Sequence, residues 1–456
     1  MPGPGRPAVA VAAVHLALCF SLLPAPRAAA SPDVEDPALR TQITRLDNGL
    51  TVLLLPDAST PAVSFQMWVR AGAKDETEYT GLAHLFEHMM FRGTDRLPPE
   101  SHERLIEARG GRVNAYTTAD NTVYFADVAP DSLPLVIELE AERLRNLRIT
   151  DEVLASERQV VLEERRMRTE DQPQGRAFEA LLALAFTAHP YRVPTIGWRS
   201  DIEAVTVEAC REFFHAYYAP NNIVLAVAGS FDAADALARI REQFGPLEPV
   251  AHVPRSPTRE PEQRGERRAI VHFDVRSPIL AAAWHAPATG HADAEPLDVA
   301  SLVLSGGASS RLYRKLVYER GQALGAHGGY SEFEQAGLFF AFASVRSDGD
   351  VHEVERLFMD EIARLRRAPV PAAELAKAKR QIEVDLISGM ETSSEMASRI
   401  GSEYVHFGRI RPVEERLAAY RAVTAADVQR VAATYLRDER RSVVHVVRPP
   451  DAEARP

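Results

Sequence analysis

The chain has 456 residues, of which 46% are hydrophobic and 26% are charged, and its formal net charge is -11. This length and ordinary soluble composition predict two or more hydrophobic cores and argue against a single small module. The acidic balance lacks the basic footprint that phosphate contacts require, so we expect no nucleic acid as a partner.

Residues 1–30 are typical of a secretory signal peptide. Arg6 precedes a mostly apolar run from Val9 to Leu23, and prolines and three alanines at positions 28–30 follow it. The run is short and broken by prolines, which argues against a membrane anchor, and we expect cleavage near Ala30. The protein is therefore expected to be exported. It would be periplasmic if the source is a Gram-negative bacterium and secreted otherwise.

The mature chain is expected to be a soluble protein without a membrane span, because no other stretch approaches the necessary apolar length. Cys210 would be its one remaining cysteine and cannot form an internal disulfide. Stability must then come from packed cores.

The first predicted elements of the mature chain are a strand pair and a helix. The strand pair is RLDNGLTVLLLPD at 45–57, with an Asn-Gly turn. The helix lies within GLAHLFEHMMFRGT at 81–94, where Gly81 precedes an apolar periodic face and Gly93 follows as a stop signal.

This helix carries two histidines four residues apart. Positions i and i+4 lie on one helical face, so His84 and His88 could present two imidazoles to one ion. Zinc suits such a pair, and a catalytic zinc site needs a third protein ligand and one position for water. Glu87 lies beside the second histidine, where its carboxylate could take a proton from that water. The alternative is an amphipathic helix with satisfied histidines, and the motif favours metal without settling the choice.

Two later segments bear on such a site. GGRVNAYTTADNTVYFADV at 110–128 predicts a glycine-led pair of alternating strands. Residues 151–172 read as a second helix that could carry the third ligand. Glu157 and Glu164 are seven residues apart there and share a face with Val160 and Val161. The other side of that helix is expected to carry Glu163, Arg165 and Arg166. From periodicity alone, a solvated acidic helix is about as well supported as a ligand-bearing one.

The clearest break in the chain is the proline-rich segment 246–264, which predicts an extended linker. Its two flanks are alike in pattern. Residues 205–229 match 423–447 as a capped helix followed by an apolar strand, and 110–128 match the glycine-led strands from Gly325. The second half also opens with a strand pair, ERRAIVHFDVRSPILAAAWHA from Glu266.

The duplication predicts the domain organisation and the fold class. We expect a first domain at 31–245 with the metal site and a homologous second domain at 265–456 without one. Hairpin signals beside long helices favour the α+β class, with two α/β-sandwich domains rather than a doubly wound parallel sheet.

These motifs resemble those of the pitrilysin or insulinase group of zinc peptidases, whose His-x-x-Glu-His motif reverses the commoner His-Glu-x-x-His. The resemblance covers nearly all of the mature chain. Its length and duplication resemble the short branch, which includes mitochondrial processing peptidases and their bacterial two-subunit relatives. In that branch each chain supplies two homologous domains and forms half of a clam-like chamber.

The resemblance implies roles for individual residues. It assigns one Zn²⁺ per chain to His84, His88 and Glu164, and the general base to Glu87. Glu157 is implied to orient a histidine ligand by accepting its other N–H. The substrate backbone would lie along an edge strand, nearest to Asn114, Ala115 and Tyr116.

One departure from the family pattern concerns the second half. Active members carry an arginine and a tyrosine there that grip the substrate, whereas the aligned positions here are Val317 and Leu324. Neither side chain donates a hydrogen bond. Tyr318, Arg320 and Tyr330 are nearby but out of register. We therefore hypothesise that this chain is the zinc-bearing subunit of a heterodimer and that a homologous partner supplies the missing pair.

Two main functions compete at this point. The first is an exported zinc endopeptidase that hydrolyses peptides or unfolded segments by metal-activated water. The second is a non-catalytic assembly or scaffold subunit of the same superfamily, which the intact motif disfavours. Metal-dependent hydrolysis of a non-peptide substrate is a third and weaker alternative.

Overall fold

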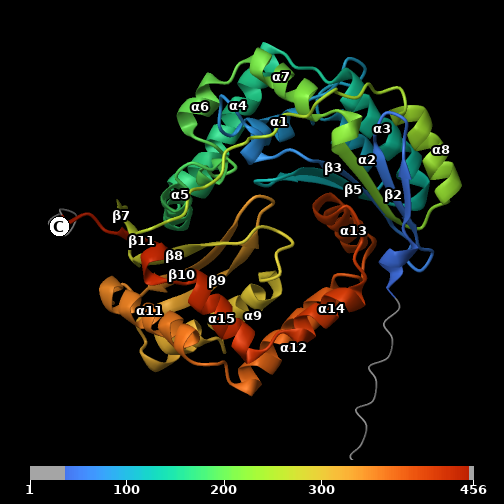
Figure 1. The fold of residues 1–456 in the computed structure, drawn as a ribbon. Helices are drawn as coiled ribbons and strands as arrows, with labels where there is room; N and C mark the ends of the chain where they lie inside the picture. Colours follow the sequence, from blue (N-terminus) through green and yellow to red (C-terminus); the bar gives the residue numbers. More distant parts are fainter. Residues whose placement is uncertain (1–35, 451–456) are drawn as a thin grey trace, which may run out of the picture. The chain divides into compact units, whose positions relative to one another are not determined.

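Two β-sheets organise residues 36–450, the part of the chain that the computed structural model describes (Figure 1). The signal peptide predicted at 1–30 lies outside these residues. The strands of the first sheet are β1 (Gln42–Arg45), β2 (Thr51–Pro56), β3 (Val63–Val69), β4 (Arg112–Thr117), β5 (Thr122–Val128) and β6 (Ile223–Gly229). The strands of the second are β7 (Arg267–His272), β8 (Ile279–Ala286), β9 (Ala323–Glu332), β10 (Gly337–Val345) and β11 (Arg441–Val447).

The two sheets have the same topology, which confirms the predicted duplication. The first sheet has the order β1-β2-β6-β3-β5-β4, and the second has the order β7-β11-β8-β10-β9. The second order repeats the first from β2 onward, and β1 has no counterpart in the second sheet. The β2/β6 and β7/β11 pairs are parallel, and the remaining neighbours are antiparallel. The strand pair at 45–57 forms the antiparallel β1/β2 hairpin. The strands predicted after Glu266 also form, but β11 lies between them.

Helices alternate with the strands along the chain in a similar order in the two halves. In the first half they are α1 (Leu82–Met89), α2 (Ser101–Glu107), α3 (Leu133–Asn146), α4 (Asp151–Arg165), a π-helical turn (Arg166–Glu170), α5 (Pro173–Ala185), α6 (Arg199–Ala204), α7 (Val207–Tyr217) and α8 (Ala233–Phe244). In the second half they are α9 (Ala294–Ser305), α10 (Arg311–Tyr313), a π-helical turn (Arg314–Glu319), α11 (Val351–Arg367), α12 (Ala372–Ser388), α13 (Ser393–Phe407), α14 (Val413–Ala422) and α15 (Ala425–Tyr435). Short 3-10 turns join several of these elements. Among residues 36–450, no helix combines the length and apolarity needed to cross a bilayer.

Each sheet buries one face under its own helices. The first core packs Phe65 and Tyr124 of the sheet against Phe86 of α1 and Phe213 of α7. In the second core, residues of β8 and β10 pack against α9, α11 and α15. The edge strands β4 and β7 alternate between more and less exposed residues, whereas the central strands β3 and β6 are buried along their whole length. Side chains therefore point from these central strands into a covered layer on each face.

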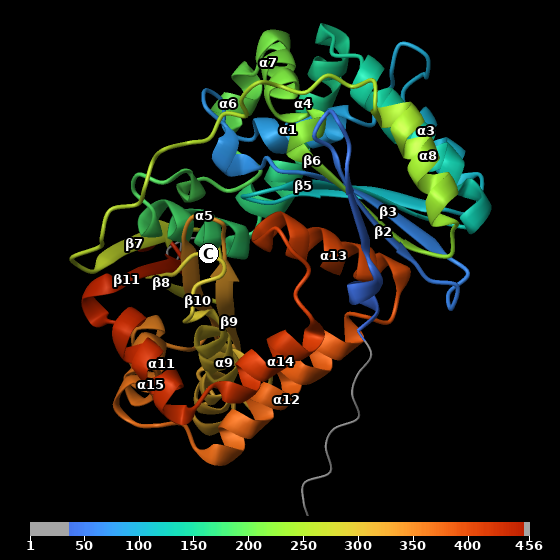
Figure 2. The ribbon, with the colours of Figure 1, turned by 45° about the vertical axis from the view of Figure 1, so that its right-hand side comes forward.

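The other face of each sheet is covered by a helix from the opposite half of the chain (Figures 1 and 2). Helix α5, from the first half, packs on β8 and β11, where Leu181 contacts the cluster that contains Val444. Helix α13, from the second half, packs on β3 and β6, where Ile400 joins the cluster that contains Trp68. The domains predicted as separate segments, 31–245 and 265–456, therefore each lend one helix to the other's sheet.

The segment 246–264 contains no helix or strand, in keeping with the predicted linker. It is nevertheless tied to the protein by specific side chains. Arg255 donates hydrogen bonds to the carbonyl of Arg70 and to Oδ1 of Asn222. The carboxylate of Glu260 accepts backbone N–H groups from residues 187–189. These contacts hold the extended chain in one path.

Candidate metal centre

Helix α1 is positioned by its N-terminus and by its apolar face. Gly81 adopts a left-handed conformation with φ 84°, which favours glycine, and directly precedes the helix. The carboxylate of Glu76 accepts the N–H groups of Gly81 and Ala83 at 2.9 and 2.8 Å and so caps the first turn. Leu85 and Phe86 are fully buried in the first core. The polar side of the helix therefore has a fixed direction, toward α4 and β4.

The three predicted ligands come together at this polar side. Nε2 of His88 lies 3.4 Å from Oε2 of Glu164, and Nε2 of His84 lies 3.8 Å from the same oxygen. One donor atom from each residue lies within 4.8 Å of the others. A tetrahedral zinc ion with donors at its usual bond lengths separates those donors by about 3.4 Å. The spacing of the three donors and their chemistry, two imidazoles and a carboxylate, thus fit a zinc ion with one position left for water.

Glu157 lies behind this donor set. Its Oε2 is 3.7 Å from Nδ1 of His88, and its Oε1 forms an ion pair of 2.7 Å with Nε of Arg92. The side chain of Glu157 is buried, so the carboxylate depends on these two neighbours. A carboxylate at Nδ1 can fix the tautomer that leaves Nε2 free for a metal. Nδ1 of His84 has no hydrogen-bond partner. A carboxylate therefore lies at Nδ1 of His88 but not at Nδ1 of His84.

The pKa values of the two histidines shift in opposite directions. Burial and the neighbouring His88 lower the pKa of His84 to about 4. Burial also opposes the charged form of His88, but the acceptor carboxylates of Glu157 and Glu164 outweigh it and raise the pKa of His88 to about 9. The hydrogen bond from His88 lowers the pKa of Glu164. Zinc binding requires a neutral imidazole, so the carboxylates that favour the charged form of His88 make zinc affinity dependent on pH.

Glu87 points from the same helix toward the end of β4. Its buried carboxylate accepts a 2.5 Å hydrogen bond from Oγ1 of Thr117. Burial raises the pKa of Glu87, and the bond from Thr117 opposes that rise. A buried carboxylate one residue from a ligand can act as a proton acceptor beside a metal-activated water.

The three residues predicted to contact substrate lie on β4, which is an edge strand of the first sheet. Asn114 and Tyr116 are exposed and Ala115 is half-buried, with its N–H donating to Oδ1 of Asn114. The opposite edge of β4 is paired with β5 throughout. The outer edge can therefore accept a further extended chain by main-chain hydrogen bonds.

Sequence reasoning placed two side chains of α4 wrongly. Val160 is expected to share the apolar face of Glu157 and Val161, but it is 42% exposed, whereas those two residues are fully buried. Arg165 was predicted toward the other side, yet it is buried and donates to Oε2 of Glu179 and to the carbonyl of Gly197. The buried face of α4 is turned relative to the expected one, since it includes Arg165 and excludes Val160. Arg165 can be buried because Glu179 of α5 provides an acidic partner.

Three residues around the centre were missed by sequence reasoning. Arg92 pairs with Glu157, and Arg168 lies 2.6 Å from Oε1 of Glu164. Thr117 contacts Glu87. A signal existed for Thr117 alone, because it follows Val113 and Ala115 at the inward positions of an alternating strand, where a hydroxyl needs a partner.

A second cluster of possible ligands lies in the second half, where His352, Glu355 and His445 approach one another. Arg268 donates to both oxygens of Glu355 at 2.8 and 2.6 Å, and Nε2 of His445 lies 2.7 Å from Oε2. The carboxylate is thus already neutralised by a bidentate guanidinium, which a metal ion would have to displace. This cluster is a poorer metal site than the one on α1.

Comparisons with known proteins bear on the family of this chain. The family model described as Insulinase (Peptidase family M16) matches residues 51–198, and the model described as Peptidase M16 inactive domain matches residues 204–382. An uncharacterized zinc protease of Mycobacterium tuberculosis is 30% identical over 408 residues, which cover 88% of this chain and 92% of the relative. The chain belongs to peptidase family M16, the insulinase family.

Other M16 relatives agree with this assignment. Zinc protease PqqE of Helicobacter pylori is 29% identical over 404 residues, covering 88% of this chain and 91% of that protein. A probable mitochondrial-processing peptidase subunit beta of Arabidopsis thaliana is 27% identical, covering 88% of this chain and 77% of that protein. The crystal structure of a protease from Helicobacter pylori superposes with a TM-score of 0.86 at 28% identity, covering 90% of this chain and 99% of that one. The predicted family, its processing-peptidase-like branch and the two-domain M16 fold are thereby confirmed.

The two positions at which the sequence is expected to lack an arginine and a tyrosine lie at the start of β9 and just before it. Val317 is half-buried against the second core, and Leu324 is 59% exposed. Of the polar side chains nearby, Tyr318 is exposed, while the hydroxyl of Tyr330 donates to the carbonyl of Pro287. Tyr330 is therefore engaged within its own domain, and Val317 and Leu324 offer no hydrogen bond to a substrate.

Proposed function

We propose that this M16 chain is an exported zinc-dependent endopeptidase that hydrolyses peptides or unfolded segments. The observation that carries the proposal is the convergence of His84, His88 and Glu164 on one point, with Glu87 held beside them by Thr117. The similarity to zinc proteases of Helicobacter pylori and Mycobacterium tuberculosis supports the same chemistry.

Different residues of the chain would bind the metal, align the peptide and transfer the proton. Zinc, when bound by the three donors, would activate water and polarise the scissile carbonyl. The exposed edge of β4 aligns the peptide main chain by strand addition. Glu87 takes the proton of the attacking water and later delivers it to the leaving amine. Thr117 holds Oε2 of Glu87 during both steps.

The test compares zinc content with cleavage of an internally quenched peptide. Glu87→Gln should keep stoichiometric zinc and lose at least about 100-fold in kcat, because its amide cannot accept the proton. His84→Ala should lose both zinc and turnover. His215→Ala removes an exposed histidine of α7 and is the matched control, expected to behave as wild type. Undiminished cleavage by Glu87→Gln would contradict the assigned base.

We further propose that the chain acts as the zinc-bearing subunit of a heterodimer. The absence of hydrogen-bond donors at Val317 and Leu324 supports this, because an oxyanion or substrate carbonyl would find no donor there. Co-purification from the native source should recover a homologous chain that carries an arginine and a tyrosine at these positions. Full activity of the isolated chain at matched concentration would count against the heterodimer.

A non-catalytic scaffold role is the second candidate. It is favoured by the family model described as an inactive domain, which matches 204–382. The three donor residues lie at positions 84, 88 and 164, within the range of the insulinase model and outside that of the inactive-domain model, so we prefer the peptidase.

Export is proposed from the signal-peptide pattern in the sequence of residues 1–30. Intact-mass measurement of the protein recovered outside the cytoplasm should show removal of residues up to about Ala30.

A further inference from the structure

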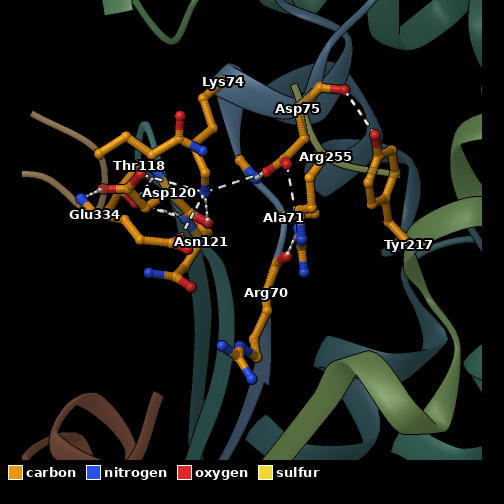
Figure 3. Close-up of polar contacts among 12 residues, drawn as sticks. Arg70, Ala71, Lys74, Asp75, Thr118, Asp120, Asn121, Tyr217, Arg255 and Glu334 are labelled. Carbon is orange, nitrogen blue, oxygen red and sulfur yellow. Dashed lines mark hydrogen bonds and ion pairs between the residues drawn. The ribbon is translucent and has the colours of Figure 1, made fainter. Parts of the chain in front are cut away.

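A buried lysine lies where the two domains meet. The side chain of Lys74 is 1% exposed and lies 3.2 Å from Oδ1 of Asp120, 3.4 Å from Oδ2 of Asp75 and 3.0 Å from Oε2 of Glu334 (Figure 3). Its Nζ also donates to the carbonyl of Asp120 at 3.1 Å. Burial alone would lower the pKa of Lys74, but the three carboxylates outweigh it and raise that pKa. These carboxylates therefore favour the charged form of the buried lysine.

The carboxylates around Lys74 come from separate parts of the fold. Asp120 lies in the turn 118–121 between β4 and β5, and Glu334 lies in the turn 333–336 between β9 and β10. These hairpins occupy equivalent places in the two sheets. The turns also touch directly, because the N–H of Glu334 donates to Oδ2 of Asp120 at 3.0 Å. Tyr191 donates to the other oxygen of Asp120 at 2.5 Å and accepts the N–H of Gln335.

The 3-10 turn that carries Lys74, Ala73–Asp75, is fastened to the β4–β5 turn through its backbone. The N–H groups of Ala73 and Lys74 donate to the carbonyls of Thr118 and Ala119 at 3.1 and 2.9 Å. Gly72 makes this approach possible, since a Cβ there would lie 2.5 Å from the carbonyl oxygen of Thr118. The next residue after this turn is Glu76, which caps helix α1.

This arrangement links the second domain to the metal centre. Thr117, which contacts Glu87, immediately precedes the turn that Lys74 holds. The edge strand β4 ends at the same point. A displacement of the β9–β10 turn would therefore be transmitted through Glu334 and Lys74 to β4 and to Thr117.

We propose that Lys74 is a positioning residue that latches the β9–β10 turn of the second domain onto the β4–β5 turn, and so fixes the substrate strand β4 at the metal centre. The latch does not contact substrate. Through this latch, the position of the second domain affects how tightly the first domain binds a peptide. This inference rests on the proposed peptidase function.

The test weakens the contact between the domains and leaves the core intact. Lys74→Met would leave three carboxylates without their cation and is expected to prevent folding. Glu334→Gln instead removes one charge from a side chain that is 48% exposed. Glu415→Gln is the matched control, because Glu415 is 46% exposed and pairs with Arg409, and neither residue belongs to either turn.

We expect Glu334→Gln to raise KM for a long extended peptide by about 5- to 10-fold, with a smaller change in kcat and unchanged zinc content, because a misplaced β4 weakens the main-chain pairing that binds the peptide. Hydrogen–deuterium exchange should become faster in 112–128 and 323–345. A pair that only adds stability would reduce the folded fraction and so the apparent kcat, with KM unchanged.

The outcomes separate this inference from the proposed function. If wild type binds zinc but cleaves no peptide, alone or with its partner, the proposed function fails, and the exchange measurement alone then tests the latch. If wild type cleaves peptides and Glu334→Gln matches Glu415→Gln in both KM and exchange, the latch is overturned.

Discussion

Oγ1 of Thr117 donates a 2.5 Å hydrogen bond to Oε2 of Glu87, which joins the end of the edge strand β4 to the helix that carries both histidines. The carboxylate is buried, and burial raises its pKa, whereas this hydrogen bond favours the ionised form that a base requires. One hydroxyl thus both orients the base and favours its ionised form.

Replacing Thr117 by valine should lower kcat by about 10-fold, because the same-sized side chain no longer holds or stabilises the carboxylate. Zinc content should not change, since Thr117 does not touch a donor residue. Thr117→Ser keeps the hydroxyl and should retain most of the activity. Steady-state cleavage of a quenched peptide by the two variants decides the point. Retained activity in Thr117→Val together with a loss in Thr117→Ser would show that the methyl group, and not the hydroxyl, matters.

Glu157→Gln should weaken zinc binding by about 10- to 100-fold, because the neutral amide no longer fixes Nδ1 of His88 as a carboxylate does. The measurement is a competition titration with a chromophoric chelator. Glu163→Gln lies on the same helix, removes an exposed charge that pairs with Arg166, and should leave the zinc affinity unchanged. An unchanged affinity in Glu157→Gln would remove that residue from the metal centre.

The parts of the fold that depend on local pattern were predictable from the sequence. The strand–helix repeats appear as matching segments, and the spacing of His84 and His88 fixes their common face without reference to any other element. The choice of Glu164 as third donor could not be made from periodicity, because its distance from α1 is set by how α4 packs. The resemblance to a family supplied that choice, and the structure brings the three residues together.

The errors and omissions have long-range causes. Arg165 is buried because Glu179 of α5 and the carbonyl of Gly197 lie opposite it, and neither is near it in sequence. The exchange of α5 and α13 leaves no local trace, since either helix would be equally amphipathic on its own sheet. Lys74 reads as an ordinary surface lysine until the second domain's turn is placed beside it.

The raised pKa of Glu332 should lower the free energy of unfolding as the pH rises. Burial and the nearby carboxylates of Asp298 and Glu295 raise its pKa from 4.5 to about 7, although Arg411 opposes the rise. Below pH 4.5 the group is protonated in both folded and unfolded chains, so it has no effect. Between 4.5 and 7 the folded state retains a proton that the unfolded state has lost, and stability falls. Above 7 the cost is constant.

Glu332→Gln should therefore be more stable than wild type by about 1 kcal/mol at pH 8, a value reduced for partial solvent screening, and nearly equal to it at pH 4.5. Melting curves at the two pH values measure the difference. Glu248→Gln, at an exposed position of the linker segment, is the control and should show no such pH dependence. A constant gap between wild type and Glu332→Gln at both pH values would contradict the raised pKa.

The exchange of helices between domains can be tested at Gly401. A Cβ at this position of α13 would lie 2.3 Å from Nε1 of Trp68, a buried indole on β3. The ring cannot move aside, because it lies in the middle of the first sheet and donates to Oε1 of Gln66. Helix α13 must then shift off the sheet that it covers.

Gly401→Ala should lower the free energy of unfolding by about 2 kcal/mol, since the overpacking outweighs the gain of roughly 1 kcal/mol in helix propensity. Gly265→Ala, where a Cβ meets nothing within 4 Å, is the control. In a Trp68→Leu background the smaller side chain leaves room, so adding Gly401→Ala should cost less than it does in wild type. Denaturant melts of the four variants measure both effects. If Gly401→Ala matches Gly265→Ala, α13 does not rest on Trp68, and the first sheet is not held by a helix of the second half.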